Sequence, residues 1–316
     1  MLFGSANMRV DKFLKKNPEV KTVVITGTFG HTSAIRALGI ILGQQFTVTM
    51  GVNPKVKPDI ALFDYKQPAD FPTNIQPDAV VITSCTSQEE ANLYFEIANR
   101  AKAVFVNYSD VPQEYAKLLS NAEVTTYGDE LPADYYFENQ SATINGQDGD
   151  IVNPERERFP ATIKLIGEHN LRPVAMAVAV AKHFGEERER ILMGVNEITP
   201  TRGRLSPAKG MRGSVVIDDS ADISGYSIKL GLRAIYAIEA PSRIIIIDDA
   251  NKLNGLNIDM LSEVLVLNPM QNADMPKFKF FADDLALMNY LGGRLEENGI
   301  VLLEIPLPDI IESYIW

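Results

Sequence analysis

A short glycine-containing turn near the start of the sequence has the residue types of a phosphate-binding loop. Three apolar residues, Val23 to Ile25, precede Gly27 and Gly30, and apolar residues at helical spacing follow Thr32. This order predicts a strand, a tight loop and a helix start, where backbone N–H groups and the positive end of a helix dipole meet an anion. The candidate cofactor-binding residues of the turn are Gly27, Thr28, Gly30, His31, Thr32 and Ser33.

The turn departs from a phosphate loop at one position. A loop of this type ends in Gly-Lys-Thr, and His31 stands where the lysine would be. An imidazole is shorter than a lysine side chain and carries no fixed charge. Two interpretations follow: a weakened nucleotide site that uses His31, or a strand-to-helix turn that binds nothing.

Composition limits the classes of function. The chain has 316 residues, 46% hydrophobic content and a formal net charge of −11, which is typical of a globular protein of about two domains. Its acidity disfavours nucleic acid and anionic membranes as partners. We expect a cytoplasmic protein, because the sequence has neither a long apolar span nor a signal-peptide pattern. The single cysteine, Cys85, follows an apolar run and is expected at the edge of a core.

Strand and helix patterns alternate over the first third of the chain. The predicted strands are 23–25, 46–50, 59–63, 79–83 and 103–107, and the predicted helices are 8–20, 34–42 and 88–101. Such alternation predicts a parallel sheet with helices on both faces and ligands at the carboxyl ends of its strands.

The second half of the chain predicts a polar excursion and then another α/β unit. Residues 121–164 are rich in Asn, Gly and Asp, with short strands expected at 135–138 and 141–145. A long helix is expected at 173–184, ended by Gly185. Further predicted strands are 214–217, 243–247, 264–267 and 299–303, with helices at 227–240 and 282–292. The predicted fold is α/β: a P-loop-type, mostly parallel sheet domain with a small antiparallel excursion at 1–200, then a smaller Rossmann-like domain at 201–316.

Taken in order, the motifs resemble those of the Mur ligase superfamily, the ATP-dependent amide ligases of cell-wall precursor synthesis. The similar segments are Thr26–Thr32, Pro77–Thr83, Gly167–Asn170, Arg202–Arg204 and Val216–Ser220. The last two segments are most like those of the D-alanyl-D-alanine-adding member. The resemblance covers roughly residues 20–305. It implies ATP and Mg²⁺ as cofactors, and a nucleotide and a small amino-acid or peptide substrate as ligands.

The resemblance also implies a metal site. Thr32 would place its hydroxyl on a phosphate-bound magnesium, Asp64 would replace a metal-binding glutamate, and His169 would help to order the site. Asp64 fits that glutamate position only if the register slips by one residue, which on a strand turns a side chain to the other face. For His169 the alternative is a capping or packing role.

On the nucleotide side, the resemblance implies that Asn170 belongs to the cofactor site and that Arg204 reaches the ATP phosphates. Asp218 and Asp219 would contact the ribose. The catalytic candidates are thus His31, His169 and Arg204. The alternatives are a solvated arginine and a polar strand end. Pro173 stands where the family has an adenine-contacting asparagine.

Three functions stay open on these residues. One is an ATP-dependent carboxylate–amine ligase that works through an acyl phosphate; another is a degenerate homologue, a pseudoenzyme that serves as scaffold or regulatory partner of another cell-wall enzyme. The third is a nucleotide- or sugar-phosphate-binding module. Only about 20 residues precede the turn, whereas the family's UDP-sugar domain needs about a hundred. We therefore expect this domain to be missing.

Overall fold

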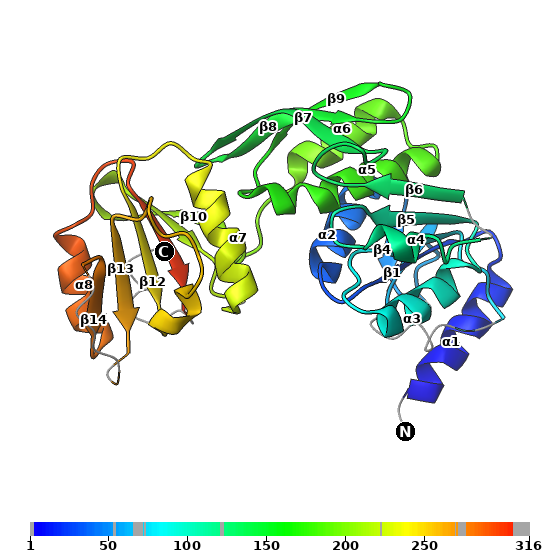
Figure 1. Cartoon of the computed structure of the whole chain (residues 1–316). Helices are drawn as coiled ribbons and strands as arrows, with labels where there is room; N and C mark the ends of the chain where they lie inside the picture. The colour runs from blue at the N-terminus through cyan, green and yellow to red at the C-terminus, as the bar shows by residue number, and fades with distance from the viewer. Residues whose placement is uncertain are drawn as a thin grey trace. The chain divides into compact units, whose positions relative to one another are not determined.

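In a computed structural model the chain forms two compact units, each described by itself (Figure 1). The structure describes residues 3–52, 55–65, 72, 74–120, 123–221, 223–268, 270 and 276–305. Unit 1 contains Met1–Gln140, Asp148–Thr162 and Asn170–Ile198, and unit 2 contains Ser141–Gln147, Ile163–His169 and Thr199–Trp316. The sequence placed the boundary at residue 200; the structure also groups 141–147 and 163–169 with unit 2.

Unit 1 is built on a six-stranded sheet in the order β2-β3-β1-β4-β5-β6, and all its neighbouring strands are parallel. The strands are β1 (Lys21–Thr26), β2 (Val48–Met50), β3 (Ile60–Asp64), β4 (Ala79–Ile82), β5 (Ala103–Asn107) and β6 (Glu123–Tyr127). Ile25 pairs with Asp64, and Thr26 pairs with Ile82. The carboxyl ends of β1, β3 and β4 therefore meet at one edge of the sheet.

Helices cover both faces of this sheet, as the alternation of strands and helices predicts (Figure 1). α1 (Phe3–Lys16) and α3 (Gln88–Ala98) pack on one face, where their buried residues share a core with Val24, Val80 and Val104. On the other face, α2 (His31–Leu42), α5 (Arg172–His183) and α6 (Arg188–Glu197) contact one another. A short helix, α4 (Gln113–Ala116), follows β5.

The polar excursion forms a three-stranded sheet in the order β7-β8-β9. Its strands are β7 (Tyr136–Thr143), β8 (Gly146–Val152) and β9 (Arg158–Ile163). The two short strands expected at 135–138 and 141–145 are one continuous strand, β7, followed by a two-residue turn. The prediction that residues 123–127 belong to this excursion was wrong, because they form β6 at the edge of the main sheet.

Unit 2 has a six-stranded sheet in the order β10-β11-β15-β12-β13-β14, in which only the β10–β11 pair is antiparallel. The strands are β10 (Ser206–Lys209), β11 (Val215–Asp218), β12 (Arg243–Ile247), β13 (Glu263–Leu267), β14 (Phe278–Phe281) and β15 (Ile300–Glu304). α7 (Gly225–Tyr236) packs on one face and α8 (Asp284–Gly292) on the other. The predicted fold class is confirmed. None of the described helices is long and apolar enough to cross a membrane.

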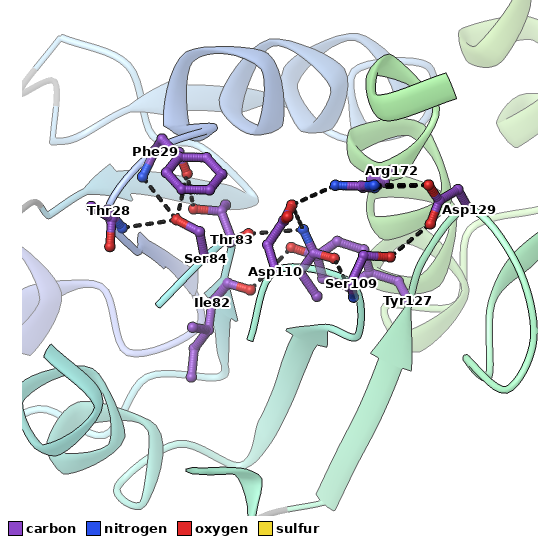
Figure 2. A network of polar contacts seen from close by, with 11 residues as sticks. Thr28, Phe29, Ile82, Thr83, Ser84, Ser109, Asp110, Tyr127, Asp129 and Arg172 are labelled. Atoms are coloured by element: carbon purple, nitrogen blue, oxygen red, sulfur yellow. Dashed lines mark hydrogen bonds and ion pairs between the residues drawn. The ribbon is translucent and has the colours of Figure 1, made fainter. Parts of the chain in front are cut away.

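An arginine at the start of α5 holds the carboxyl ends of two strands in unit 1. The guanidinium of Arg172 lies 2.7 Å from Asp110, after β5, and 2.8 Å from Asp129, after β6 (Figure 2). Burial alone would raise the pKa of Asp129, but hydrogen bonds from Arg172 and Ser109 outweigh burial and lower it. One partly buried cation thus serves two carboxylates.

The same network continues to the end of β4. The side-chain amide of Asn107 donates to Asp110 at 2.9 Å and to the carbonyl oxygen of Thr83 at 2.8 Å. The hydroxyl of the fully buried Tyr127 donates to the carbonyl oxygen of Ile82 at 3.1 Å (Figure 2). These contacts fix the strand ends beneath the phosphate-type turn.

We expect Arg172→Gln to lower the free energy of unfolding of unit 1 by about 2 kcal/mol, because it leaves two partly buried carboxylates without their cation. Urea unfolding measures the loss. Arg158→Gln is the matched control: Arg158 also faces two carboxylates, Glu138 and Asp150, but its side chain is 50% exposed. The control should lose less than about 1 kcal/mol. Equal losses would contradict a buried clamp.

A buried carboxylate lies at the turn between α5 and α6. Glu186 is 4% exposed, and among the described residues neither of its oxygens has a hydrogen-bond partner. Burial raises the pKa of Glu186 to about 7, although the nearby Arg190 acts in the opposite direction. The folded protein therefore favours the protonated form of this side chain.

This carboxyl makes stability depend on pH with a known sign. The stabilisation from the raised pKa is fully present below about pH 4.5, is lost as the pH rises to about 7, and is absent above that. Glu186→Gln should therefore be more stable than the wild type at pH 8, by about 2 kcal/mol, and similar to it at pH 4. Thermal unfolding across this pH range measures the difference. Glu189→Gln, an exposed change in the first turn of α6, should show no such trend.

Candidate functional site

The predicted strand, loop and helix start are present in unit 1. β1 ends at Thr26 and α2 begins at His31, with Gly27 at φ 140° and Gly30 at φ 90° between them. Both values lie in the region that favours glycine, so the turn requires glycine at these positions. Gly30 is the N-cap, and within the described residues no side chain caps the helix. The first N–H groups of α2 lie beside the exposed Thr32, an arrangement that suits an anion.

His31 does not point toward the space where an anion would sit. Its ring is 6% exposed and lies between two acceptors of unit 1. Nε2 is 2.5 Å from the carbonyl oxygen of Gly27, and Nδ1 is 2.5 Å from Oδ1 of Asp64. A carbonyl oxygen only accepts, so Nε2 carries a hydrogen, and another hydrogen lies between Nδ1 and the carboxylate. Both ring nitrogens are thus used within the protein.

Asp64 is at the turn, where the resemblance would put a metal-binding acid. It is the last residue of β3, opposite Ile25, and its side chain is 35% exposed. One of its oxygens is already bound to His31. Among the described residues, no group of three His, Cys, Asp or Glu side chains is placed to hold a metal ion.

A second carboxylate lies beside the turn. Glu90, in the first turn of α3, accepts hydrogen bonds from the hydroxyls of Thr28 at 2.9 Å and Thr86 at 2.7 Å. Burial works to raise the pKa of Glu90, but these bonds together hold it below its usual value. An ionised carboxylate next to Thr28 opposes the binding of a phosphate, which itself is anionic.

In unit 2, the two acids predicted to contact a ribose hold the turn that carries Arg204. Asp218 is fully buried and accepts from the backbone N–H of Gly203 at 3.1 Å. Asp219 accepts from the N–H of Leu205 at 3.1 Å and from the hydroxyl of Ser227 at 3.3 Å. The Gly-Arg motif and the Asp-Asp motif are therefore one structural element, with the side chain of Arg204 exposed.

His169 lies close to this element. It is half-buried in a short 3-10 helix, η2 (Glu168–Asn170), and its ring lies over Gly167, which has φ 90°. A Cβ at Gly167 would come within 2.8 Å of Cε1 of His169 and within 3.1 Å of the side chain of Leu205. Gly167 thus leaves the space that His169 occupies beside the arginine turn.

The predicted site residues thus fall into two groups. In unit 1 the structure places together Gly27, Thr28, Gly30, His31, Thr32, Ser33 and Asp64, and in unit 2 it places together His169, Arg204, Asp218 and Asp219. Asn170 belongs to unit 1. The metal set of Thr32, Asp64 and His169 therefore draws on both units and stays a prediction.

Sequence reasoning missed three residues at this edge of the sheet: Ser84, Glu90 and Arg172. Ser84 follows directly on a predicted strand, and side chains in that position gather at the ligand-binding edge of a parallel sheet. This signal was available for Ser84. Glu90 and Arg172 lie in the first turns of helices and carry no comparable signal.

Comparisons with known proteins fit this architecture. A scan of protein-family models finds no match. The UDP-N-acetylmuramoyl-tripeptide–D-alanyl-D-alanine ligase of Bacillus subtilis is 24% identical over 271 residues, covering 75% of this chain and 57% of the relative. The UDP-N-acetylmuramoyl-L-alanyl-D-glutamate–L-lysine ligase of Staphylococcus aureus is 24% identical over 189 residues, covering 59% of this chain and 35% of the relative. The chain thus spans little more than half of the Bacillus relative.

Solved structures share the fold. MurF from Acinetobacter baumannii superposes with a TM-score of 0.77 at 13% identity, covering 98% of this chain and 80% of that one. MurF from Thermotoga maritima, in complex with ADP, gives 0.76 at 14% identity, with coverages of 95% and 79%. The order of motifs and the sequence relatives agree: this chain is similar to Mur ligases in sequence, and it shares the fold of the MurF structures.

Proposed function

We propose that this chain acts in cell-wall precursor metabolism as a degenerate ligase, a scaffold or regulatory partner that does not transfer a phosphoryl group. The observation that carries the proposal is the position of His31. It stands where the family has a phosphate-contacting lysine, and both of its ring nitrogens are bound to Gly27 and Asp64. Within the described part of the chain, the turn therefore presents no cationic side chain to a nucleotide phosphate.

The chemistry of the family explains why this loss matters. In an ATP-dependent ligase, a substrate carboxylate takes the γ-phosphoryl group of ATP, giving an acyl phosphate and ADP; an amine then attacks the carbonyl carbon and phosphate leaves. Such a transfer depends on cations placed around the spreading negative charge. Here the imidazole at the lysine position points inward, and two carboxylates, Asp64 and Glu90, lie at the turn.

An active ligase is the second candidate, and one observation favours it. The start of α2 has no side-chain cap among the described residues and carries an exposed Thr32, so a phosphate group can still approach the helix N-terminus. Arg204 would then hold the transferred group, and His169 would assist from the same unit. Thr32, Asp64 and His169 stay the predicted residues of its magnesium site.

A product assay separates these candidates. The wild-type protein is mixed with magnesium, ATP, UDP-N-acetylmuramoyl-tripeptide and D-alanyl-D-alanine, with the Bacillus subtilis ligase as positive control. We expect neither amide product nor phosphate release above background, because the turn lacks a cation for the transfer. Amide product that disappears in Arg204→Gln would contradict the proposal and establish the ligase.

Calorimetry with magnesium and ATP tests the third candidate function. Binding of ATP without turnover in the product assay would indicate a nucleotide-binding module.

Restoring the lysine tests the role of His31 directly. His31→Lys should bind ATP at least tenfold more tightly than the wild type, because a longer ammonium group reaches a phosphate that the buried ring does not. Gln45→Lys adds the same charge just beyond the other end of α2 and should change affinity by less than about twofold. Equal gains in both variants would show a general charge effect instead.

A further inference from the structure

The inner side of the phosphate-type turn is filled by a residue that the proposed function does not use. Ser84 follows β4 and is fully buried. Its hydroxyl oxygen accepts from the backbone N–H of Thr28 at 3.0 Å and of Phe29 at 2.8 Å (Figure 2). The same hydroxyl lies 3.1 Å from the carbonyl oxygen of Phe29, to which it donates.

The neighbouring Thr83 binds the turn from the same side. Its hydroxyl lies 2.5 Å from the carbonyl oxygen of Phe29 and 3.2 Å from that of Thr26. A Cβ at Gly27 would come within 2.3 Å of this hydroxyl and within 2.8 Å of the backbone nitrogen of Ser84. Gly27 therefore lets the turn lie directly on Thr83 and Ser84, with no room for a ligand between them.

Two N–H groups that converge on one oxygen are the arrangement that a phosphate loop offers to a phosphate oxygen. In this chain the oxygen belongs to the protein. We infer that the Ser84 hydroxyl is an autoinhibitory occupant of the turn, which takes the N–H groups of Thr28 and Phe29 away from any phosphate. This inference rests on the proposed function, since it treats the turn as one that once bound a phosphate.

The contact holds for two physical reasons. Ser84 is part of the same chain, so its effective concentration at the turn is far above that of a free ligand. A buried hydroxyl also needs a partner, and the turn supplies both donors and an acceptor. An anion would form stronger, charge-assisted bonds to the same N–H groups, but only after it has displaced the serine.

Removing the hydroxyl tests the inference. Ser84→Ala should bind inorganic triphosphate at least tenfold more tightly than the wild type by calorimetry, because the N–H groups of Thr28 and Phe29 lose the hydroxyl that accepts from both. The N–H of Thr28 keeps only its longer bond, 3.4 Å, to the backbone carbonyl oxygen of residue 84. Ser109→Ala is the matched control: it deletes a hydroxyl from the same network, but that hydroxyl donates to Asp129 and not to the turn. The control should bind as the wild type does. A folded Ser84→Ala protein with unchanged or weaker binding would overturn the inference.

A second measurement applies if Ser84→Ala does not fold. Triphosphate is titrated into the wild-type protein while backbone amide signals are followed by NMR. We expect the amides of Thr32 and Ser33 to shift while those of Thr28 and Phe29 stay in place; shifts of all four together would overturn the inference. Amide product in the ligase assay would refute the proposed function alone, so the two failures are distinguishable.

Discussion

The buried imidazole of His31 is the interaction on which this account depends. The side chain of a histidine at the first position of α2 can point outward to a ligand or inward to the protein. Here the carbonyl of Gly27 and the carboxylate of Asp64 hold it inward. These two bonds join the turn to the end of β3. They also keep away from solvent the side chain that stands where a phosphate loop has its lysine.

The surroundings of the turn support its closed form. The hydroxyls of Thr83 and Ser84 form hydrogen bonds with the backbone of the turn. The side-chain amide of Asn107 donates to the carbonyl oxygen of Thr83 and to Asp110. Arg172 then fixes the strand ends to the start of α5. The polar side chains at this edge bind one another and the backbone of the turn. These contacts support the proposed function, in which the residues of this edge serve structure.

The sequence predicted those parts of the fold that hydrophobic runs determine. The strands at 103–107 and 243–247 were predicted to the residue, because each is a short apolar run with clear ends. β6 is an exposed edge strand and β9 contains Pro160, so neither gives a strong strand pattern. The glycines predicted the turn, and the sequence analysis named both His31 and Asp64 as candidate site residues. That they bind each other depends on the pairing of β1 with β3, which no local pattern encodes.

One measurement tests the central claim most directly: NMR of the His31 side chain, labelled with ¹⁵N, with and without millimolar magnesium and ATP. The account predicts that both ring nitrogens keep their hydrogen bonds and that neither signal moves when the nucleotide is added, because the ring stays between Gly27 and Asp64. A shift of both signals that saturates with ATP would show the ring turning toward a phosphate, and would contradict the account.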